Sequence, residues 1–587
     1  MNANPRDPYH HRARSAPQGA SPQSAEADPI TTEIIRHALN SAAKQMKRAA
    51  IRTSFSPVIY ESLDFAVVLY DRQVRLLGQG PTQPMFMGTM GFAIESAVQA
   101  VGGESALEPG DVIGYNKPYA TGSHPQDCAL VMPVFLSSGE LIGYAANKAH
   151  WMDIGAMSFY CTNTTDVYQE GMVIPGIKLY RRGELNTDVH RLILANCRLK
   201  QSVDGDINAQ VASLHVGARE FVRIVERYGL ATFSSCVERM FDHGERVVRE
   251  FIRKVPDGVY RATCQMDDNG VDDRPVPFEV TVTIDGTNAR FDFSQAPEAQ
   301  RGPINCPQPS TVAFSRITLA LLAGNAHELP NEGFFRPLEV ITRPGSMFHP
   351  IDPQPCFLYA WPAFSAMEGI LEAFSRATGG AIPSGSAADM NSMFYYGMRG
   401  DTGEPFVFAA PWPVGHGALP HADGSTVFIA AISYAQTQSP ELLEAKNPML
   451  FEKWEFTPDS GGAGQFRGGC GWEVCFTALS DGAVISTVER TQVPGWAQKG
   501  GLSGAANRLT IDFADGHSET IRKKTDLPVS AGTRFHICCG GGGGYGEPAK
   551  RDPAAVQRDL RNGLITEKHA RELYPQALRA VDPGRGK

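Results

Sequence analysis

The sequence predicts an α+β fold: a large, multi-lobed mixed architecture with antiparallel hairpins and packed helices. Helical and strand-like patterns occur in separate blocks along the chain, whereas a parallel α/β sheet requires strands and helices to alternate regularly. Two Asp-Gly dipeptides, at 285–286 and 515–516, each separate two strand-like segments, which is a strong hairpin signal. The length of 587 residues exceeds the size at which one hydrophobic core usually stops growing, so we expect several lobes.

The first ordered element is expected to be a helix that begins at Pro29 and ends near Arg52. Asp28 is suited to cap this helix, and proline is tolerated in a first helical turn. Apolar residues then recur at helical spacing from Ile34 to Ala50, which is typical of one buried face. Similar periodicity predicts helices over residues 92–101, 205–228, 234–253, 313–322 and 363–378, and a pair of surface helices within 553–578.

Short apolar or alternating segments bounded by turn residues predict the strands. They cover residues 65–70 and 74–77, 111–115, 130–135 and 141–147, 278–284 and 289–293, and the hairpin within 509–521.

These patterns divide the chain into five segments. The first is rich in Pro, Ser, Ala, Arg and His and has almost no aliphatic residues, so we expect it to be disordered. The segments are a disordered tail (1–27), an N-terminal α+β lobe with a metal site (28–200), a central helical and hairpin region (201–380), a C-terminal β-rich and glycine-rich region (381–549), and C-terminal helices with a tail (550–587).

Composition narrows the class of protein. The net charge of −9, without a long basic block, argues against nucleic acid as the main partner. No apolar run reaches the roughly 20 residues that cross a bilayer, and no apolar segment precedes a cleavage site at the N-terminus. The eleven cysteines are scattered and show no CxxC spacing, which fits reduced thiols better than disulfides. We therefore expect a cytoplasmic protein.

Two His-x-x-Asp motifs indicate chemistry. They are His124-x-x-Asp127 and His150-x-x-Asp153, and each follows the end of a predicted strand, where loops commonly present site residues. Mixed imidazole and carboxylate ligands suit a divalent metal such as zinc, manganese or iron. The alternative is a set of hydrogen-bonded structural histidines and capping aspartates.

Other reactive side chains lie close to these motifs in the sequence. Glu61 and Asp64 precede a predicted strand and are candidates for a general base or an additional metal ligand; the alternative is a charged strand entry. Cys128 and Cys161 lie near the histidines, so a cysteine nucleophile is conceivable, although buried inert cysteine is the more common case.

The five consecutive glycines at 540–544 are a further candidate site. Exposed backbone amides in such a loop can bind an anion, but no Lys-Ser/Thr pair follows, so the segment is not a phosphate-binding P-loop. The alternative, which we favour, is a tightly packed multiple turn that only glycine can adopt. No GxSxG nucleophile motif is present.

Taken in order, several motifs resemble the hydantoinase B/oxoprolinase family, which includes the acetone carboxylase alpha subunit. The resemblance extends from about Asp28 to Leu578. It is carried by the segments Ser54-Phe55-Ser56-Pro57 with Glu61 and Asp64-Phe65, Asn116-x-Pro118-Tyr119 with His124-x-x-Asp127, His150-x-x-Asp153-Ile154-Gly155, Arg301-Gly302-Pro303-x-Asn305, Asn331-Glu332-Gly333 with Arg336-Pro337, 459–469, and Gly544-Tyr545-Gly546-x-Pro548.

The resemblance implies a subunit that works beside an actin-like, ATP-using partner of the hydantoinase A type. In the family, the partner phosphorylates a carbonyl oxygen, and the activated species is processed at a metal centre. The resemblance implies His124, Asp127, His150 and Asp153 as the metal ligands. Asp64 or Glu61 would then accept a proton while metal-activated water opens a cyclic amide, such as a hydantoin or 5-oxoproline, in a hetero-oligomeric enzyme.

Two alternatives remain open from the sequence. One is an ATP-dependent carboxylase of small ketones, of the acetone or acetophenone carboxylase type. The other is a non-catalytic scaffold for an ATPase subunit. The scaffold is suggested by departures from the family pattern: Lys117 replaces a usual aspartate, and Thr82 and Phe86 lie where hydantoinase-like members commonly carry histidines.

Overall fold

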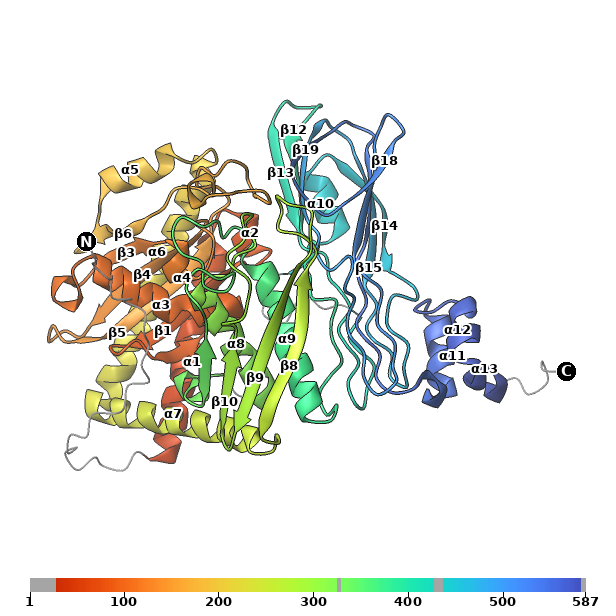
Figure 1. The fold of residues 1–587 in the computed structure, drawn as a ribbon. Coiled ribbons are helices and arrows are strands. Elements are labelled where there is room, and N and C mark those ends of the chain that lie inside the picture. The colour runs from red at the N-terminus through yellow and green to blue at the C-terminus, as the bar shows by residue number, and fades with distance from the viewer. Residues whose placement is uncertain (1–27, 325–328, 427–435, 582–587) are drawn as a thin grey trace, which may run out of the picture.

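A computed structural model describes residues 28–324, 329–426 and 436–581. Its N-terminal half forms one broad body of helices and sheet, the hairpin strands β8–β10 stand beside it, and a β-rich part follows with three short helices at its far end (Figure 1). Four sheets, mostly antiparallel, are present in the described residues, which confirms the α+β class. The tail predicted at residues 1–27 lies outside the described residues.

A seven-stranded sheet with the order β2-β1-β5-β4-β3-β6-β7 forms the centre of the N-terminal body, and all its neighbouring strands are antiparallel. The neighbouring strands β1, β5 and β4 are buried along nearly their whole length, because helices cover both faces. The strands are β1 (Phe65–Asp71), β2 (Leu76–Gln79), β3 (Val112–Tyr115), β4 (Asp127–Phe135), β5 (Leu141–His150), β6 (Pro175–Arg181) and β7 (Glu184–Leu185).

The helices α1, α6 and α7 share a core with one face of this sheet, and α3 covers the other face. Helix α1 begins as the sequence predicts: the Asp28 side chain accepts a hydrogen bond from the Thr31 backbone amide at 2.9 Å. The helices of this part are α1 (Pro29–Thr53), α2 (Pro57–Tyr60), α3 (Pro84–Ala100), α4 (Pro118–Thr121), α5 (Thr187–Ala195), α6 (Lys200–Tyr228) and α7 (Leu230–Ile252).

A second, four-stranded sheet has the order β11-β10-β9-β8, with β10 and β11 parallel. Helix α9 packs on it, and α8 links α9 to α3, so that one aromatic-rich core joins this sheet to the first body. These elements are β8 (Gly258–Met266), β9 (Val276–Asp285), β10 (Asn288–Asp292), β11 (Leu338–Ile341), α8 (Gln308–Ala323) and α9 (Ala360–Ala377).

Two further sheets, β13-β12-β16-β19 and β14-β15-β20-β17-β18, share a core in the C-terminal part. Their elements are β12 (Met393–Met398), β13 (Pro405–Ala410), α10 (Pro440–Lys446), β14 (Met449–Phe456), β15 (Trp472–Ala478), β16 (Gly482–Thr487), β17 (Arg508–Asp512), β18 (Ser518–Ile521), β19 (Lys523–Val529) and β20 (Arg534–Cys538). The chain ends in α11 (Pro553–Arg561), α12 (Glu567–Leu573) and α13 (Pro575–Val581), three helices where a pair was expected.

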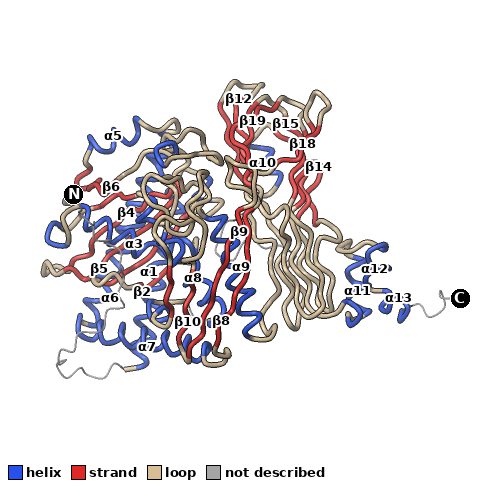
Figure 2. Tube along the Cα trace, in the orientation of Figure 1, coloured by secondary structure: helices blue, strands red, loops and turns tan. Residues whose placement is uncertain are grey.

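The run 540–544 lies inside a layer of extended segments between the C-terminal sheets and helices (Figure 2). Its amides and carbonyls bond to several other segments; for example, Gly543 N donates to Gly385 O at 2.9 Å, and Gly544 N donates to Leu502 O at 2.9 Å. A Cβ atom at Gly541 would lie 1.8 Å from the Ser460 carbonyl oxygen. The expected multiple turn is therefore wrong. Glycine is needed for close backbone approach, since no residue of the run has a positive φ.

Most predicted elements are confirmed, with differences at their ends. Helix α3 begins at Pro84, eight residues before the predicted start at Phe92. Helix α6 packs on α1 and on the first sheet, although the division predicted from the sequence separates it from that lobe. Among the helices that the structure describes, none is long and apolar enough to cross a membrane.

We predict that Gly541→Ala destabilises the protein far more than Gly286→Ala. The alanine methyl at position 541 meets backbone that cannot move away, which we expect to cost more than about 3 kcal/mol. Gly286 sits in an open hairpin turn with φ of 58°, where alanine costs roughly 1–2 kcal/mol. The apparent Tm and soluble yield of the two variants measure the difference. Equal Tm values would contradict the close-packed layer.

Candidate metal centre

The pairing of β4 with β5 brings the two predicted motifs together. Asp127 is the first residue of β4 and lies directly opposite His150, the last residue of β5. His124 lies in the short loop that precedes β4, after the left-handed Gly122 that ends α4. The expectation that both motifs lie in loops after strand ends is thus wrong for Asp127 and His150, whose positions are set by the sheet register.

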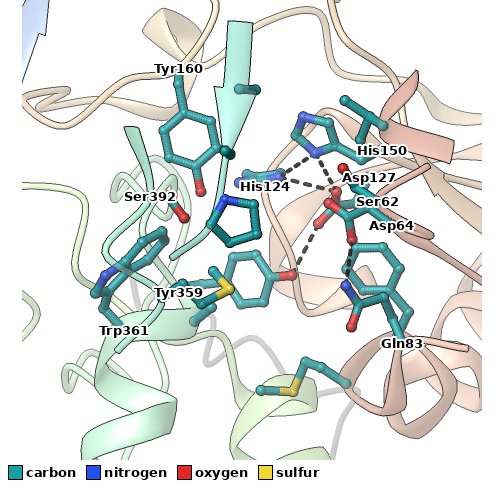
Figure 3. A pocket seen from close by; sticks show the side chains of 18 of the residues that line it. Ser62, Asp64, Gln83, His124, Asp127, His150, Tyr160, Tyr359, Trp361 and Ser392 are labelled. Atoms are coloured by element: carbon teal, nitrogen blue, oxygen red, sulfur yellow. Dashed lines mark hydrogen bonds and ion pairs between the residues drawn. The ribbon is translucent and has the colours of Figure 1, made fainter. Parts of the chain in front are cut away.

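His124, Asp127 and His150 form a compact triangle of donor atoms. His124 Nε2 lies 3.0 Å from Asp127 Oδ1 and 3.0 Å from His150 Nδ1, and His150 Nδ1 lies 3.0 Å from Asp127 Oδ1. All three side chains are buried. Figure 3 shows the two imidazoles and the carboxylate converging at one wall of a cavity.

A segment from another part of the fold orients two of these side chains. The carbonyl oxygen of Phe357 lies 2.8 Å from His124 Nδ1, and the Tyr359 hydroxyl donates to Asp127 Oδ2 at 3.1 Å. The segment is itself held by Glu170, whose Oε1 accepts from the backbone amides of Cys356 and Phe357, both at 2.8 Å. Burial raises the pKa of Glu170 to about 8. Such outer contacts fix ring orientation and tautomer in metal sites.

The charges within the triangle depend on one another. Burial opposes ionisation of Asp127, but the two imidazoles hold its pKa below the ordinary range. Burial by itself would lower the pKa of His124, but the neighbouring Asp127 carboxylate outweighs burial, so the pKa of His124 is raised overall. Two ring nitrogens and a carboxylate oxygen only 3.0 Å apart are stabilised by a shared positive charge, either a proton or a cation.

The donor set fits a divalent metal. Phe357 O accepts from a proton on His124 Nδ1, so the neutral ring directs the lone pair of its Nε2 at Asp127 and His150. Two imidazoles and one carboxylate are the protein ligands of several zinc and iron enzymes, which keep further positions open for water or substrate. The triangle is therefore a candidate site for a buried divalent metal.

Asp64 lies beside the triangle, whereas Asp153 and Glu61 do not. Asp64 lines the same cavity, its carboxylate accepts from Gln83 Nε2 at 3.1 Å, and burial raises its pKa. Asp153 forms a salt bridge with Arg198 at 2.7 Å and caps the backbone near residue 199. Glu61 pairs with Lys446. The structure therefore brings together three of the four expected ligands, with Asp64 adjacent.

The cavity beside the triangle has a volume of about 130 Å³. Much of its wall is aromatic or aliphatic. The hydroxyls of Tyr160 and Ser392 lie on the opposite side of the cavity from the carboxylates of Asp64 and Asp127 (Figure 3). Among the described residues that line it, none is a lysine or an arginine. The apolar part of the wall consists of Val58, Met85, Phe86, Trp361, Phe364, Met390, Phe394 and Pro411, with three alanines.

The departures from the family pattern fall in different places. Lys117 is not among the residues that line the cavity, and it pairs with Asp352 at 2.8 Å near the surface. Thr82 is buried and bonds the Gly80 carbonyl oxygen, and of the three only Phe86 lines the cavity. Cys128 and Cys161 are buried, and burial raises the pKa of both thiols, which favours the inert interpretation.

Sequence reasoning missed the residues that support the triangle. Glu170, Phe357, Tyr359 and Tyr160 come from segments with no recognisable motif. Lys148 is also missed: it is fully buried two residues before His150, and its ammonium donates to Thr121 O at 2.6 Å, beside the loop of His124. The sequence offers one signal for these residues: a lysine within a largely apolar strand, which the structure buries along its whole length, is unusual and points to a site nearby.

Comparison with known proteins agrees with this architecture. The family model for hydantoinase B/oxoprolinase matches residues 28–548. The beta subunit of the caprolactamase of Pseudomonas jessenii is 30% identical over 568 residues, covering 93% of this chain and 96% of that one. The B-type subunit of a putative D-/L-hydantoinase of Pseudomonas sp. (strain NS671) is 28% identical over 570 residues, covering 93% of this chain and 95% of that one.

Solved structures show the same fold. The ATP-dependent caprolactamase from Pseudomonas jessenii superimposes with a TM-score of 0.85 at 28% identity, covering 93% of this chain and 96% of that one. Acetone carboxylase, at 20% identity, superimposes with a TM-score of 0.82, covering 93% of this chain and 79% of that one. The chain belongs to the hydantoinase B/oxoprolinase family. The hydantoinase and caprolactamase relatives are each one subunit of an enzyme.

We predict that His150→Ala lowers bound metal by close to one equivalent relative to the native chain, because one of the three ligands of the triangle is removed. Asp153→Asn serves as the matched control in the second motif and should keep its metal, although the lost salt bridge with Arg198 lowers stability. Metal analysis of the purified variants measures this. If the Asp153 variant lost its metal while the His150 variant kept it, the assignment of His124, Asp127 and His150 as the ligands would be wrong.

We also predict that Glu170→Ala weakens metal binding by about 10- to 100-fold, the usual cost of losing an outer contact. Without this carboxylate, the amides of residues 356 and 357 lose their acceptor and the Phe357 carbonyl is free to shift. Glu170→Gln retains an acceptor oxygen at the same place and should bind metal nearly as well as the native chain. Competition titration with a chelator gives both affinities; equal losses in the two variants would argue against this positioning role.

Proposed function

We propose that this chain is the metal-binding subunit of an ATP-dependent hydrolase that opens a neutral cyclic amide. The observation that carries the proposal is the His124–Asp127–His150 triangle at the wall of a small, largely apolar cavity. The names of the caprolactamase and hydantoinase relatives support the reaction class. A metal held by the triangle would polarise a carbonyl or lower the pKa of water.

The cavity wall favours an uncharged ring. A small apolar cavity binds a compact ligand mainly through excluded water, and a few polar groups fix its orientation. A carboxylate on the substrate would be buried without a lysine or arginine among the described lining residues, which is costly unless a cation compensates. We therefore favour an unsubstituted or alkyl-substituted lactam over 5-oxoproline.

The chain's own residues have distinct tasks in this proposal. The aromatic wall, with Trp361 and Phe394, packs against the ring and excludes water, and the Tyr160 hydroxyl is positioned to donate to a polar atom of the substrate. Burial raises the pKa of the Tyr160 phenol well above its ordinary value, so it stays a neutral donor. Asp64, beside the triangle, accepts the proton released when water attacks.

An amide needs activation before it is attacked. Its carbonyl is a poor electrophile, and transfer of a phosphoryl group to the carbonyl oxygen removes this obstacle. In the proposed reaction a water oxygen bonds to the phosphorylated carbon, and the ring C–N bond breaks as the nitrogen takes up a proton, which leaves an acyl phosphate. A second water then displaces phosphate and leaves the free carboxylate. The sequence has no P-loop motif, so we assign ATP use to a partner ATPase subunit of the hydantoinase A type.

The matched substrates 2-pyrrolidone and 5-oxoproline test the proposal, because they share one ring and differ by a carboxylate. With the co-expressed ATPase partner, ATP and metal, we expect kcat/KM for ring opening to be at least 10-fold higher for the neutral lactam. Larger lactams should be opened as well. Asp64→Asn should lower kcat by about 10²- to 10⁴-fold, the usual contribution of a general base, while bound metal is retained.

Three outcomes would contradict parts of the proposal. Preference for 5-oxoproline would contradict the neutral substrate class. Bicarbonate-dependent consumption of acetone without ring opening would favour a ketone carboxylase. Full activity of the complex with His150→Ala would leave this chain as a scaffold.

A further inference from the structure

A second group of metal-ligating side chains lies on the C-terminal five-stranded sheet, far along the chain from the first. Glu473 is on β15, and His536 and Cys538 are on β20. The two strands are antiparallel neighbours with Glu473 opposite Cys538. Because His536 and Cys538 are two residues apart, all three side chains leave the same face of the sheet.

The distances from the His536 ring nitrogen to the other two ligand atoms are close to those that a tetrahedral ion requires. His536 Nε2 lies 2.8 Å from Glu473 Oε1 and 3.4 Å from Cys538 Sγ, and all three atoms lie within 4.8 Å of one another. Zinc bonded to sulfur at about 2.3 Å and to nitrogen or oxygen at about 2.0–2.1 Å gives edges of about 3.3–3.6 Å. A shift of roughly half an ångström would bring the His–Glu contact to this spacing.

The group is open to solvent, unlike the other thiols of the chain. Among the eleven cysteines, all of which the structure describes, Cys538 alone is not buried. The side chain of His536 is 33% exposed and that of Glu473 is 13% exposed. An ion can therefore reach the three ligands without local unfolding, and water can occupy a fourth position.

Two cations border the group and must be compatible with a metal. Lys453 Nζ contacts Glu473 Oε1 at 2.9 Å, and it also lies 3.4 Å from Glu455 Oε1, a second carboxylate that it can pair with instead. Arg508 donates toward Cys538 Sγ at 3.5 Å, a contact that stabilises a thiolate. Lys453 therefore competes with the ion for Glu473, whereas Arg508 supports the anionic ligand.

We propose that Glu473, His536 and Cys538 bind a zinc ion that cross-links β15 to β20. Thiolate, imidazole and carboxylate together suit zinc better than magnesium or calcium, which select oxygen ligands. The site differs from the His124–Asp127–His150 triangle in having a sulfur ligand and in being partly exposed. It stabilises the C-terminal sheet and takes no part in the proposed hydrolysis.

Cobalt substitution tests this proposal on the full chain, since cobalt is a spectroscopic stand-in for zinc. The triangle has no sulfur ligand, so a thiolate-to-cobalt charge-transfer band reports only on the second site. We expect the native chain to develop this band as cobalt fills the second site, and excess zinc to abolish it. Cys538→Ser should eliminate the band. Cys475→Ser, a serine substitution on the same sheet face, is the matched control and should keep it.

Ligand and competitor variants should act in opposite directions. His536→Ala and Glu473→Gln should each weaken zinc binding by at least 10-fold, measured by competition titration. Lys453→Met should tighten it several-fold, because it removes a like charge and a competitor for Glu473; damage to the fold would not produce this gain. Zinc should also raise the apparent Tm of the native chain more than that of Cys538→Ser.

Absence of the band, its persistence in Cys538→Ser, or its dependence on Cys475 instead would overturn the proposal. If neither Lys453→Met nor Glu473→Gln changed the zinc affinity, Glu473 would be ruled out as a ligand.

Discussion

Register between β4 and β5 is the constraint on which the metal centre depends. Asp127 and His150 are a cross-strand pair, so their separation is a property of the sheet and not of a flexible loop. A slip of one residue would turn one of the two side chains to the other face, and the triangle would be lost. Helices pack on both faces of these strands, so burial on each side makes such a slip expensive.

The rest of the centre is completed by segments that are remote in sequence. Phe357 and Tyr359 fix His124 and Asp127, and Glu170 holds the backbone of that segment. The first sheet thus provides the ligands, while the segment before α9 orients them. The same segment leads into Trp361 and Phe364, which line the apolar cavity. Ligand orientation and cavity shape are therefore coupled through one short stretch of chain.

The C-terminal part depends on a different physical device. Extended glycine segments approach one another so closely that a methyl group at Gly541 or Gly542 would overlap a backbone carbonyl. Backbone hydrogen bonds between segments satisfy the polar groups there and replace side-chain packing. Beside this layer, the outer face of the five-stranded sheet holds the proposed zinc site, where strand register again sets which ligands meet.

The sequence alone determined most of the long helices, the Asp-Gly hairpins and the two His-x-x-Asp motifs, because helical periodicity, Asp-Gly turns and ligand chemistry are local properties. It also indicated the family through the order of its motifs. Only the tertiary structure decided which candidates converge: Asp153 resembles Asp127 in its motif, yet it is bound to Arg198, whereas Asp64 approaches the triangle. Convergence depends on strand register and on contacts between distant segments, and neither is encoded in the spacing of residues along the chain.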